Sequence, residues 1–217
     1  MKAIILGATS GIGKSIADNL ENSCDQIIRL GSKDVDTSSI KSVDKFCKKF
    51  KSPDILVLNT GGPPDMKFHK MNDKIWINNF NKLFLSFAKI IQKVGVKKNG
   101  YIFLISSFII KQPSDELIIS SSLRSGFSSL FKSLSIIYKN KNIKFINIAP
   151  GPIKTTRLVN LLKKENISIK QFEKEMYGKK VPEPDEIGKF VKFVIENKII
   201  SLNGITITFD SNLIRGL

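Results

Sequence analysis

The stretch Lys2–Gly13 reads K-A-I-I-L-G-A-T-S-G-I-G, an apolar run that breaks directly into three glycines. Apolar residues then recur at helical spacing in residues 14–20, so the stretch predicts a strand, a glycine loop and a helix. Glycine lets the backbone turn sharply and approach a ligand closely. The first turn of a helix offers unpaired N–H groups and the positive end of the helix dipole. This order of elements predicts a site for the diphosphate of a dinucleotide.

Further apolar runs indicate strands in the rest of the chain. Several are continuously apolar, as strands covered on both faces are, and stretches with apolar residues three and four positions apart lie between them. Strands that alternate with helices predict an α/β fold with a doubly wound parallel sheet, the Rossmann fold, in three α/β/α layers. The runs cover residues 26–30, 55–59, 101–106, 143–148 and 205–209.

The segment of residues 30–54 is short for this pattern, because it has room for a turn and one helix only. We therefore expect the helix after the second strand to be missing. The third strand, near residues 34–36, should be vestigial and lie at the sheet edge, where its loss disturbs the core least. No repeat or low-complexity linker divides the chain, so we expect a single domain over residues 1–217.

The composition narrows the classes of function. His69 is the only histidine, and Cys24 and Cys47 are the only cysteines, so we expect neither a metal site nor a disulfide framework. No segment has the pattern of a signal peptide or the apolar length of a membrane span, which indicates a cytoplasmic protein without membrane contact.

The formal net charge of +16 is high for 217 residues. Such a field attracts an anionic cofactor, an acidic carrier protein or nucleic acid. The lysines are spread along the chain without interleaved aromatic residues, so we expect a solvated basic surface and no dedicated nucleic-acid face.

Three more motifs follow predicted strands, at the edge where doubly wound sheets bind ligands. They are N-T-G-G-P-P at residues 59–64, I-S-S at residues 105–107 and N-I-A-P-G-P-I-K-T at residues 147–155. With the G-x-x-x-G-x-G spacing of Gly7, Gly11 and Gly13, they resemble the short-chain dehydrogenase/reductase family over essentially the whole chain. The N-T-G-G-P-P motif and an S-x-x-x-R pattern at residues 120–124 resemble a branch similar to 3-oxoacyl-[acyl-carrier-protein] reductases.

The resemblance implies a nicotinamide-dinucleotide site built from these motifs. Asp34 is placed as the acid that contacts the adenine, and Asp36 is the alternative because the shortened segment blurs the register. The predicted cofactor-binding residues are Gly7, Thr9, Ser10, Gly11, Ile12, Gly13, Ser32, Lys33, Asp34, Asn59, Thr60, Gly61, Pro150, Gly151, Ile153 and Thr155.

The residues after the second predicted strand favour NADP over NAD. A carboxylate at that corner would bind the ribose diol and repel a 2′-phosphate. The corner reads R-L-G-S-K at residues 29–33, with no acid before Asp34. Ser32 and Lys33, with Ser10 and Lys14 nearby, could supply hydroxyl and ammonium donors to a phosphate. We therefore expect NADP, with NAD as the alternative.

The catalytic pattern departs from that of the family, whose members use a Ser, a Y-x-x-x-K pair and an Asn on the preceding helix. The resemblance places Ser107 as the serine that polarises the carbonyl and Asn79 as the helix Asn. Asn78 and Asn81 are near alternatives for the helix Asn. Ser120 and Arg124 stand where the Tyr and the Lys belong. A phenol of pKa ~10 can be tuned toward neutrality by a cation, whereas an aliphatic hydroxyl cannot, and arginine does not release a proton.

Three functions stay open at this point. The resemblance implies an NADP-dependent reductase of a 3-oxoacyl thioester or other ketone, in which the proton comes through water, Ser120, or a residue of the substrate loops such as His69 or Tyr177. The second is an NAD(P)-binding sensor or scaffold without turnover, and the third is a basic nucleic-acid-binding protein. A substrate lid is expected around residues 156–184. The apolar helix after Ser120 implies a homodimer or homotetramer.

The cofactor preference gives a first prediction. NADPH should bind at least several-fold more tightly than NADH, because the corner after the second strand offers Ser32 and Lys33 and no carboxylate. Titration of both nucleotides against the purified protein checks this, and equal or reversed affinities would contradict it.

Overall fold

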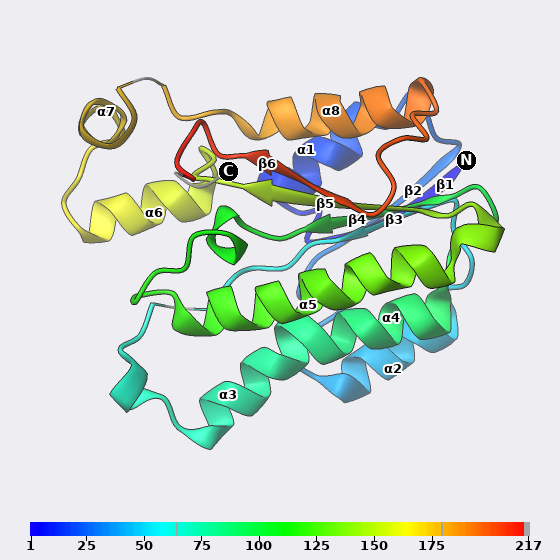
Figure 1. The fold of residues 1–217 in the computed structure, drawn as a ribbon, viewed down its shortest axis with the longest axis horizontal. Coiled ribbons are helices and arrows are strands. Elements are labelled where there is room, and N and C mark those ends of the chain that lie inside the picture. The colour runs from blue at the N-terminus through cyan, green and yellow to red at the C-terminus, as the bar shows by residue number, and fades with distance from the viewer. Residues whose placement is uncertain (64, 179, 215–217) are drawn as a thin grey trace.

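A parallel sheet of six strands runs through the middle of the molecule (Figure 1). The computed structural model describes residues 1–63, 65–178 and 180–214. In space the strands follow the order β2-β1-β3-β4-β5-β6. Their bounds are β1 (Lys2–Leu6), β2 (Gln26–Leu30), β3 (Ile55–Leu58), β4 (Tyr101–Ile105), β5 (Lys144–Pro150) and β6 (Ile205–Phe209). This confirms the α/β fold with a doubly wound parallel sheet.

Helices cover both faces of the sheet and complete the three layers (Figure 1). One face carries α1 (Gly11–Asn19) and α8 (Pro184–Glu196), and the other carries α2 (Ile40–Lys49), α4 (Ser86–Val94) and α5 (Ile118–Ile137). Helix α3 (Asp73–Phe80) continues into α4 through the π-helical turn η2 (Asn81–Leu85). The remaining short elements are η1 (Phe68–Lys70), η3 (Phe108–Ile110), η4 (Lys139–Lys141), α6 (Thr156–Lys164), α7 (Ile169–Phe172) and η5 (Glu173–Tyr177).

The continuous apolar run of β1 shows why the strand predictions hold. Ile4 and Leu6 pack into the core on the side of α2, α4 and α5, whereas Ala3 and Ile5 pack into the core on the side of α1 and α8. Successive side chains of a strand point to opposite faces, so a strand covered on both faces is apolar at every position.

The expected loss of a strand-helix unit after the second strand is confirmed. A single helix, α2, lies between β2 and β3, and residues 31–39 contain no strand or helix, so β2 is the edge of the sheet. The segment folds back instead: the Gly31 N–H donates to the Asp34 carboxylate at 2.8 Å, and Val35 is buried in the core. Val35 thus fills part of the space that a complete strand-helix unit would otherwise occupy.

Strand ends differ from the predictions by at most two residues. The largest difference is at β5, which was predicted to end at Ile148 and runs on to Pro150. Ala149 and Pro150 still pair with Thr208 and Phe209 of β6, so the ladder continues past the predicted end.

The region expected to form a lid stands beyond the carboxyl edge of the sheet, at the upper left of Figure 1. Helices α6 and α7 lie there and enclose a small apolar cluster of their own around Leu162, Phe172 and Val181. The segment therefore has internal packing, although its sequence is charged and only sparsely apolar.

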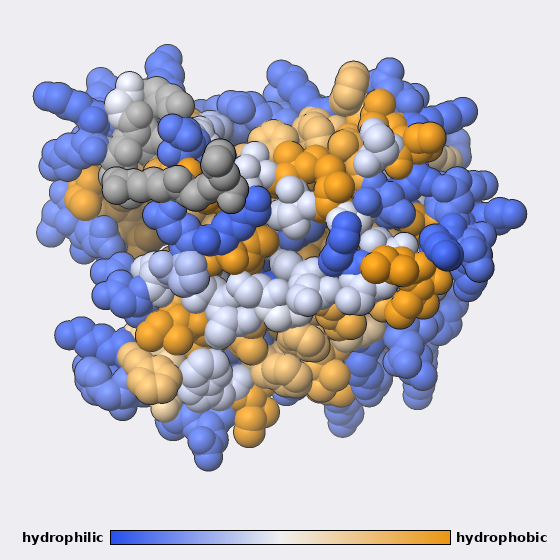
Figure 2. Space-filling model, viewed as in Figure 1, coloured by the Kyte–Doolittle hydropathy of each residue, from blue (hydrophilic) through white to orange (hydrophobic). Residues whose placement is uncertain are grey.

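The outer surface of α5 forms a pale, weakly polar band in Figure 2. Phe127 and Phe131 of this helix are buried, and Leu130 and Leu134 pack partly against the same core. Ile136 and Ile137, at the end of the helix, are exposed. Among the described residues, none of the helices combines the length and the apolar content that a bilayer crossing requires.

The contact between α1 and the turn after β1 gives a prediction on stability. An ideal Cβ at Gly13 would lie 2.2 Å from the carbonyl oxygen of Gly7 and 2.8 Å from Nδ2 of Asn59. Because backbone must move to admit a methyl group there, Gly13→Ala should lower the free energy of unfolding by about 1–3 kcal/mol. Urea unfolding measures this change.

Gly126→Ala is the matched control, since Gly126 is also helical. Its added Cβ would meet the Phe84 ring at an ordinary 3.5 Å, so this variant should be neutral or gain up to ~1 kcal/mol from helix propensity. An unchanged unfolding midpoint for Gly13→Ala would contradict the close contact.

Candidate active site

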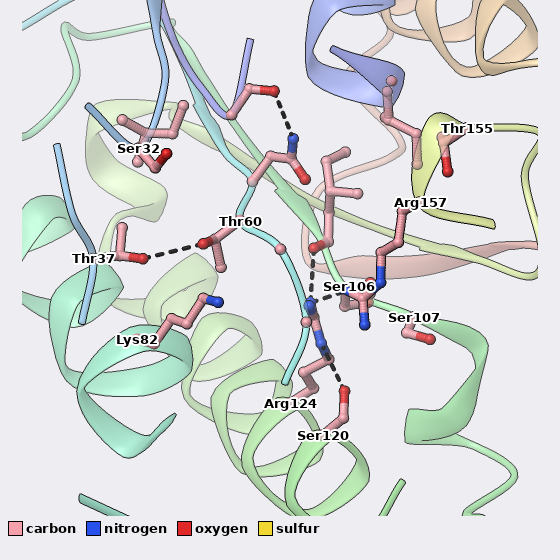
Figure 3. Close-up of a pocket in the computed structure, with 18 of the residues that line it drawn as sticks. Ser32, Thr37, Thr60, Lys82, Ser106, Ser107, Ser120, Arg124, Thr155 and Arg157 are labelled. Atoms are coloured by element: carbon pink, nitrogen blue, oxygen red, sulfur yellow. Dashed lines mark hydrogen bonds between the residues drawn. The ribbon is translucent and has the colours of Figure 1, made fainter. Parts of the chain in front are cut away.

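A cavity of about 1020 Å³ lies at the carboxyl edge of the sheet (Figure 3). Residues at or just after the ends of five strands line it: Gly7 after β1, Gly31 after β2, Asn59 after β3, Ile105 of β4 and Pro150 of β5. The strand order reverses between β1 and β3, which is where doubly wound sheets bind their ligands.

The glycine loop is shaped for a close approach. Gly7 and Gly11 have φ angles of +62° and +56°, which favour glycine. Asn59 Nδ2 donates to the Gly7 carbonyl at 3.3 Å and so ties this loop to the end of β3. Ser10, the N-cap of α1, makes no side-chain capping hydrogen bond. The N–H groups of the first turn are therefore left for an anionic ligand.

Most of the predicted cofactor residues line this cavity, and three do not. Gly13 lies beneath the loop, Lys33 is exposed to solvent, and the Asp34 carboxylate accepts from the backbone of Gly31. Asp36, the alternative acid, does line the cavity. Those that line it are Gly7, Thr9, Ser10, Gly11, Ile12, Ser32, Asn59, Thr60, Gly61, Pro150, Gly151, Ile153 and Thr155.

The two serines after β4 differ in what their hydroxyls contact. Ser106 is buried, and its hydroxyl donates to the Ile148 carbonyl of β5 at 3.3 Å. Ser107 is only partly buried and lines the cavity, and its hydroxyl has no hydrogen-bond partner among the described residues. Ser107 is therefore the serine whose hydroxyl is available to a ligand.

Arg124 occupies the floor of the cavity and is 8% exposed. Its Nη1 donates to the carbonyls of Ile105 and Ser106 at 3.1 and 3.2 Å, and its Nε donates to Ser120 Oγ at 3.2 Å (Figure 3). Burial, with a smaller contribution from the charge of Arg157, lowers the pKa of the Arg124 guanidinium to about 10. The group stays positively charged at neutral pH.

Asn79 is the last of the predicted catalytic residues, and it also lines the cavity. It is buried in α3, and its Nδ2 donates to the carbonyl of Ile75 at 2.9 Å. The π-helical turn η2 begins two residues later, and single π turns inside helices are frequent at functional sites. The structure thus brings Ser107, Asn79, Ser120 and Arg124 into one cavity.

Three further cationic residues of the cavity lining, Lys74, Lys82 and Arg157, were not predicted from the sequence, and Lys74 of α3 is exposed. Lys82 lies on η2, three residues beyond Asn79, and Arg157 lies in the first turn of α6, two residues beyond Thr155. Burial lowers the pKa of the Lys82 ammonium, and the positive charges of Arg157 and Arg124 lower it further. Helical spacing from Asn79 could have drawn attention to Lys82.

The alternative proton donors named from the sequence do not gain support from the geometry. His69 is exposed in η1 and does not line the cavity, and the side chain of Tyr177 lies outside the described part of the chain. Lys14, considered as a phosphate ligand, forms an ion pair with Asp18 at 2.5 Å and lies outside the cavity lining.

Comparison with known proteins gives a consistent result. The family model described as enoyl-(acyl carrier protein) reductase matches residues 32–211. The 3-oxoacyl-[acyl-carrier-protein] reductase FabG of Buchnera aphidicola subsp. Schizaphis graminum is 28% identical over 235 residues, which cover 94% of this chain and 93% of the relative.

Two solved structures show the same fold over nearly their full lengths. The L-sorbose reductase of Gluconobacter frateurii, complexed with NADPH and L-sorbose, aligns with a TM-score of 0.87 at 20% identity, over 100% of this chain and 97% of that one. An NADPH-bound short chain oxidoreductase of Pseudomonas aeruginosa PAO1, described as containing an atypical catalytic center, aligns with a TM-score of 0.84 at 16% identity, over 100% and 97%.

Proposed function

We infer the function from one premise: this chain belongs to the short-chain dehydrogenase/reductase family, a family of oxidoreductases. We propose that it is an NADP-dependent reductase that converts a ketone, such as a 3-oxoacyl thioester, to an alcohol. The observation that carries the proposal is the single cavity that joins the glycine loop, the uncapped start of α1 and the unpartnered hydroxyl of Ser107. The Buchnera FabG relative supports the substrate class.

The cavity fits a nicotinamide dinucleotide with a 2′-phosphate. The glycine loop and the start of α1 would hold the diphosphate, since the positive φ angles of Gly7 and Gly11 set the turn of the loop and the N–H groups lack a side-chain cap. Ser32, which lines the cavity after β2 where NAD-specific sites carry an acid, would contact the 2′-phosphate. The NADPH-bound solved structures of the same fold support this cofactor.

The other predicted cofactor residues then follow the length of the cavity. Thr60 and Gly61 would face the adenosine ribose, while Asn59 holds the glycine loop to the end of β3. Ile153 and Thr155, which precede the lid region, would face the nicotinamide amide. When bound, the reduced cofactor supplies the hydride. The side chains of this protein orient the substrate, stabilise the charged oxygen and deliver the proton.

Ser107 is the proposed donor to the carbonyl oxygen of the substrate. Hydride transfer places negative charge on that oxygen, and a preformed hydroxyl donor lowers the free energy of the charged state. The Ser107 hydroxyl is suited to this role because nothing else among the described residues holds it.

Ser120 and Arg124 act together in the place of the missing tyrosine and lysine. Ser120 Oγ accepts the Arg124 Nε–H, so the Ser120 proton is directed away from the guanidinium and can be donated into the cavity. Arg124 keeps its charge, so it stabilises a negative oxygen without releasing a proton. The proton itself is relayed from water through the Ser120 hydroxyl.

The proposed enzyme also has a substrate lid and a contact between subunits. Helices α6 and α7 with η5 form a lid within residues 156–184, since Arg157, Leu158 and Leu161 of α6 line the cavity. The partly exposed apolar residues of α5 form the contact between subunits of a homodimer or homotetramer.

Substitution of single serines tests the mechanism. Ser107→Ala should lower kcat/KM for NADPH-dependent ketone reduction about 100-fold, because it removes the donor to the charged oxygen. Ser120→Ala should cost much less, since water can take its place. Ser106→Ala is the matched control and should keep activity, because its hydroxyl contacts the Ile148 carbonyl.

The assay follows NADPH oxidation with ketones, diketones and 3-oxoacyl thioesters. Wild-type activity of Ser107→Ala would remove that assignment. Tight NADPH binding without turnover on any of these substrates would favour the sensor or scaffold function instead.

A further inference from the structure

Four cationic residues of the described part of the chain line the cavity: Lys74 of α3 is exposed, and the other three come from three separate elements. Lys82 comes from η2, Arg124 from α5 and Arg157 from α6, and all three side chains point into the cavity in Figure 3. Asp36 is the one carboxylate among the described residues that line it. The cavity wall is therefore strongly cationic wherever a substrate would lie.

None of these three cations forms an ion pair with a described residue, although the charge of Asp36 acts on Lys82. The Lys82 ammonium is half-buried and forms no hydrogen bond or ion pair with any described residue. Arg157 donates from Nη2 to the Pro63 carbonyl at 3.1 Å, and Arg124 donates to carbonyls and one hydroxyl only. Neutral acceptors satisfy some donors but carry no charge, and Asp36 alone does not balance the cations of the described lining, so an anion entering the cavity would be held strongly.

Lys82 and Arg157 converge on one short piece of backbone. Lys82 Nζ lies 4.0 Å from an ideal Cβ at Gly61, and Arg157 Nη1 lies 2.7 Å from an ideal Cβ at Gly62. The Arg157 guanidinium therefore packs directly on the backbone of Gly62, and a side chain at residue 62 would displace it. The proximity has an electrostatic effect, since the charge of Arg157 lowers the pKa of Lys82.

We propose that Lys82 and Arg157 form an anion subsite that binds a carboxylate of the substrate, so that the ketone reduced is an oxo acid. The inference rests on the proposed reductase function and specifies its substrate class. Arg157 presents a planar fork that suits a carboxylate, and Lys82 adds a point charge from the opposite side. Ser107 and Ser120, the residues proposed to act on the carbonyl, line the same cavity.

A matched pair of substrates tests the subsite. At saturating NADPH, the kcat/KM of the wild type for 3-oxobutanoate and 4-oxopentanoate is compared with that for their neutral ethyl esters. The wild type should prefer the acids about tenfold or more, which is the effect of one charge-assisted hydrogen bond. Arg157→Met and Lys82→Met should lose this preference, because KM rises much more for the acids than for the esters.

Two controls separate the substrate's carboxylate from the cofactor's phosphates. Lys163→Met removes an exposed charge from the same helix as Arg157, outside the cavity lining, and should keep the preference for acids. The dissociation constant of NADPH, followed by its fluorescence, should stay within about twofold in Arg157→Met, since a single lost charge contact at the phosphates would change it more.

Any other result would overturn either the anion subsite or the proposed reductase function. Equal use of acids and esters by the wild type would overturn the subsite and leave the reductase standing. Weaker NADPH binding in the variants, with acids and esters affected alike, would assign the cations to the cofactor's phosphates and also overturn it. If NADPH reduces neither these acids and esters nor the ketones, diketones and 3-oxoacyl thioesters named above, the proposed function fails. Calorimetry with 3-oxobutanoate alone then tests the subsite. The subsite requires that 3-oxobutanoate binds to the wild type and that Arg157→Met abolishes this binding.

Discussion

The contact of α1 with the turn after β1 is the constraint on which the site depends. Gly13 brings the helix against the Gly7 carbonyl at a distance that no side chain would permit, and Asn59 locks the same carbonyl to β3. This contact aims the start of α1 at the carboxyl edge of the sheet. A diphosphate bound there would extend along the strand ends to Ser107.

The loss of the tyrosine changes the chemistry more than the architecture. A buried guanidinium at residue 124 holds the end of β4 through two carbonyls and orients Ser120 through its hydroxyl. The site therefore keeps a fixed positive charge and a hydroxyl where a phenol and an ammonium would stand. What it gives up is a group whose own pKa can approach neutrality, so the proton has to come through a relay.

Sequence patterns predicted the fold and most of the cavity lining because both depend on local order. Once the sheet is parallel, the positions of the strands, the glycine loop and the residues that follow each strand are set. The short segment at residues 30–54 indicated the missing strand. The role of Asp34 was harder to predict, because its carboxylate accepts a hydrogen bond from the Gly31 N–H within a turn, and Asp36 lines the cavity instead. Lys82 and Arg157 meet only through tertiary structure, from elements far apart in the chain.

Uptake of a reduced nicotinamide dinucleotide by this cavity can be measured by calorimetric titration of NADPH into the purified full chain. We expect one molecule bound per chain with a dissociation constant of about 100 µM or tighter, within the range usual for enzyme ligands. No measurable uptake of either NADPH or NADH would contradict it.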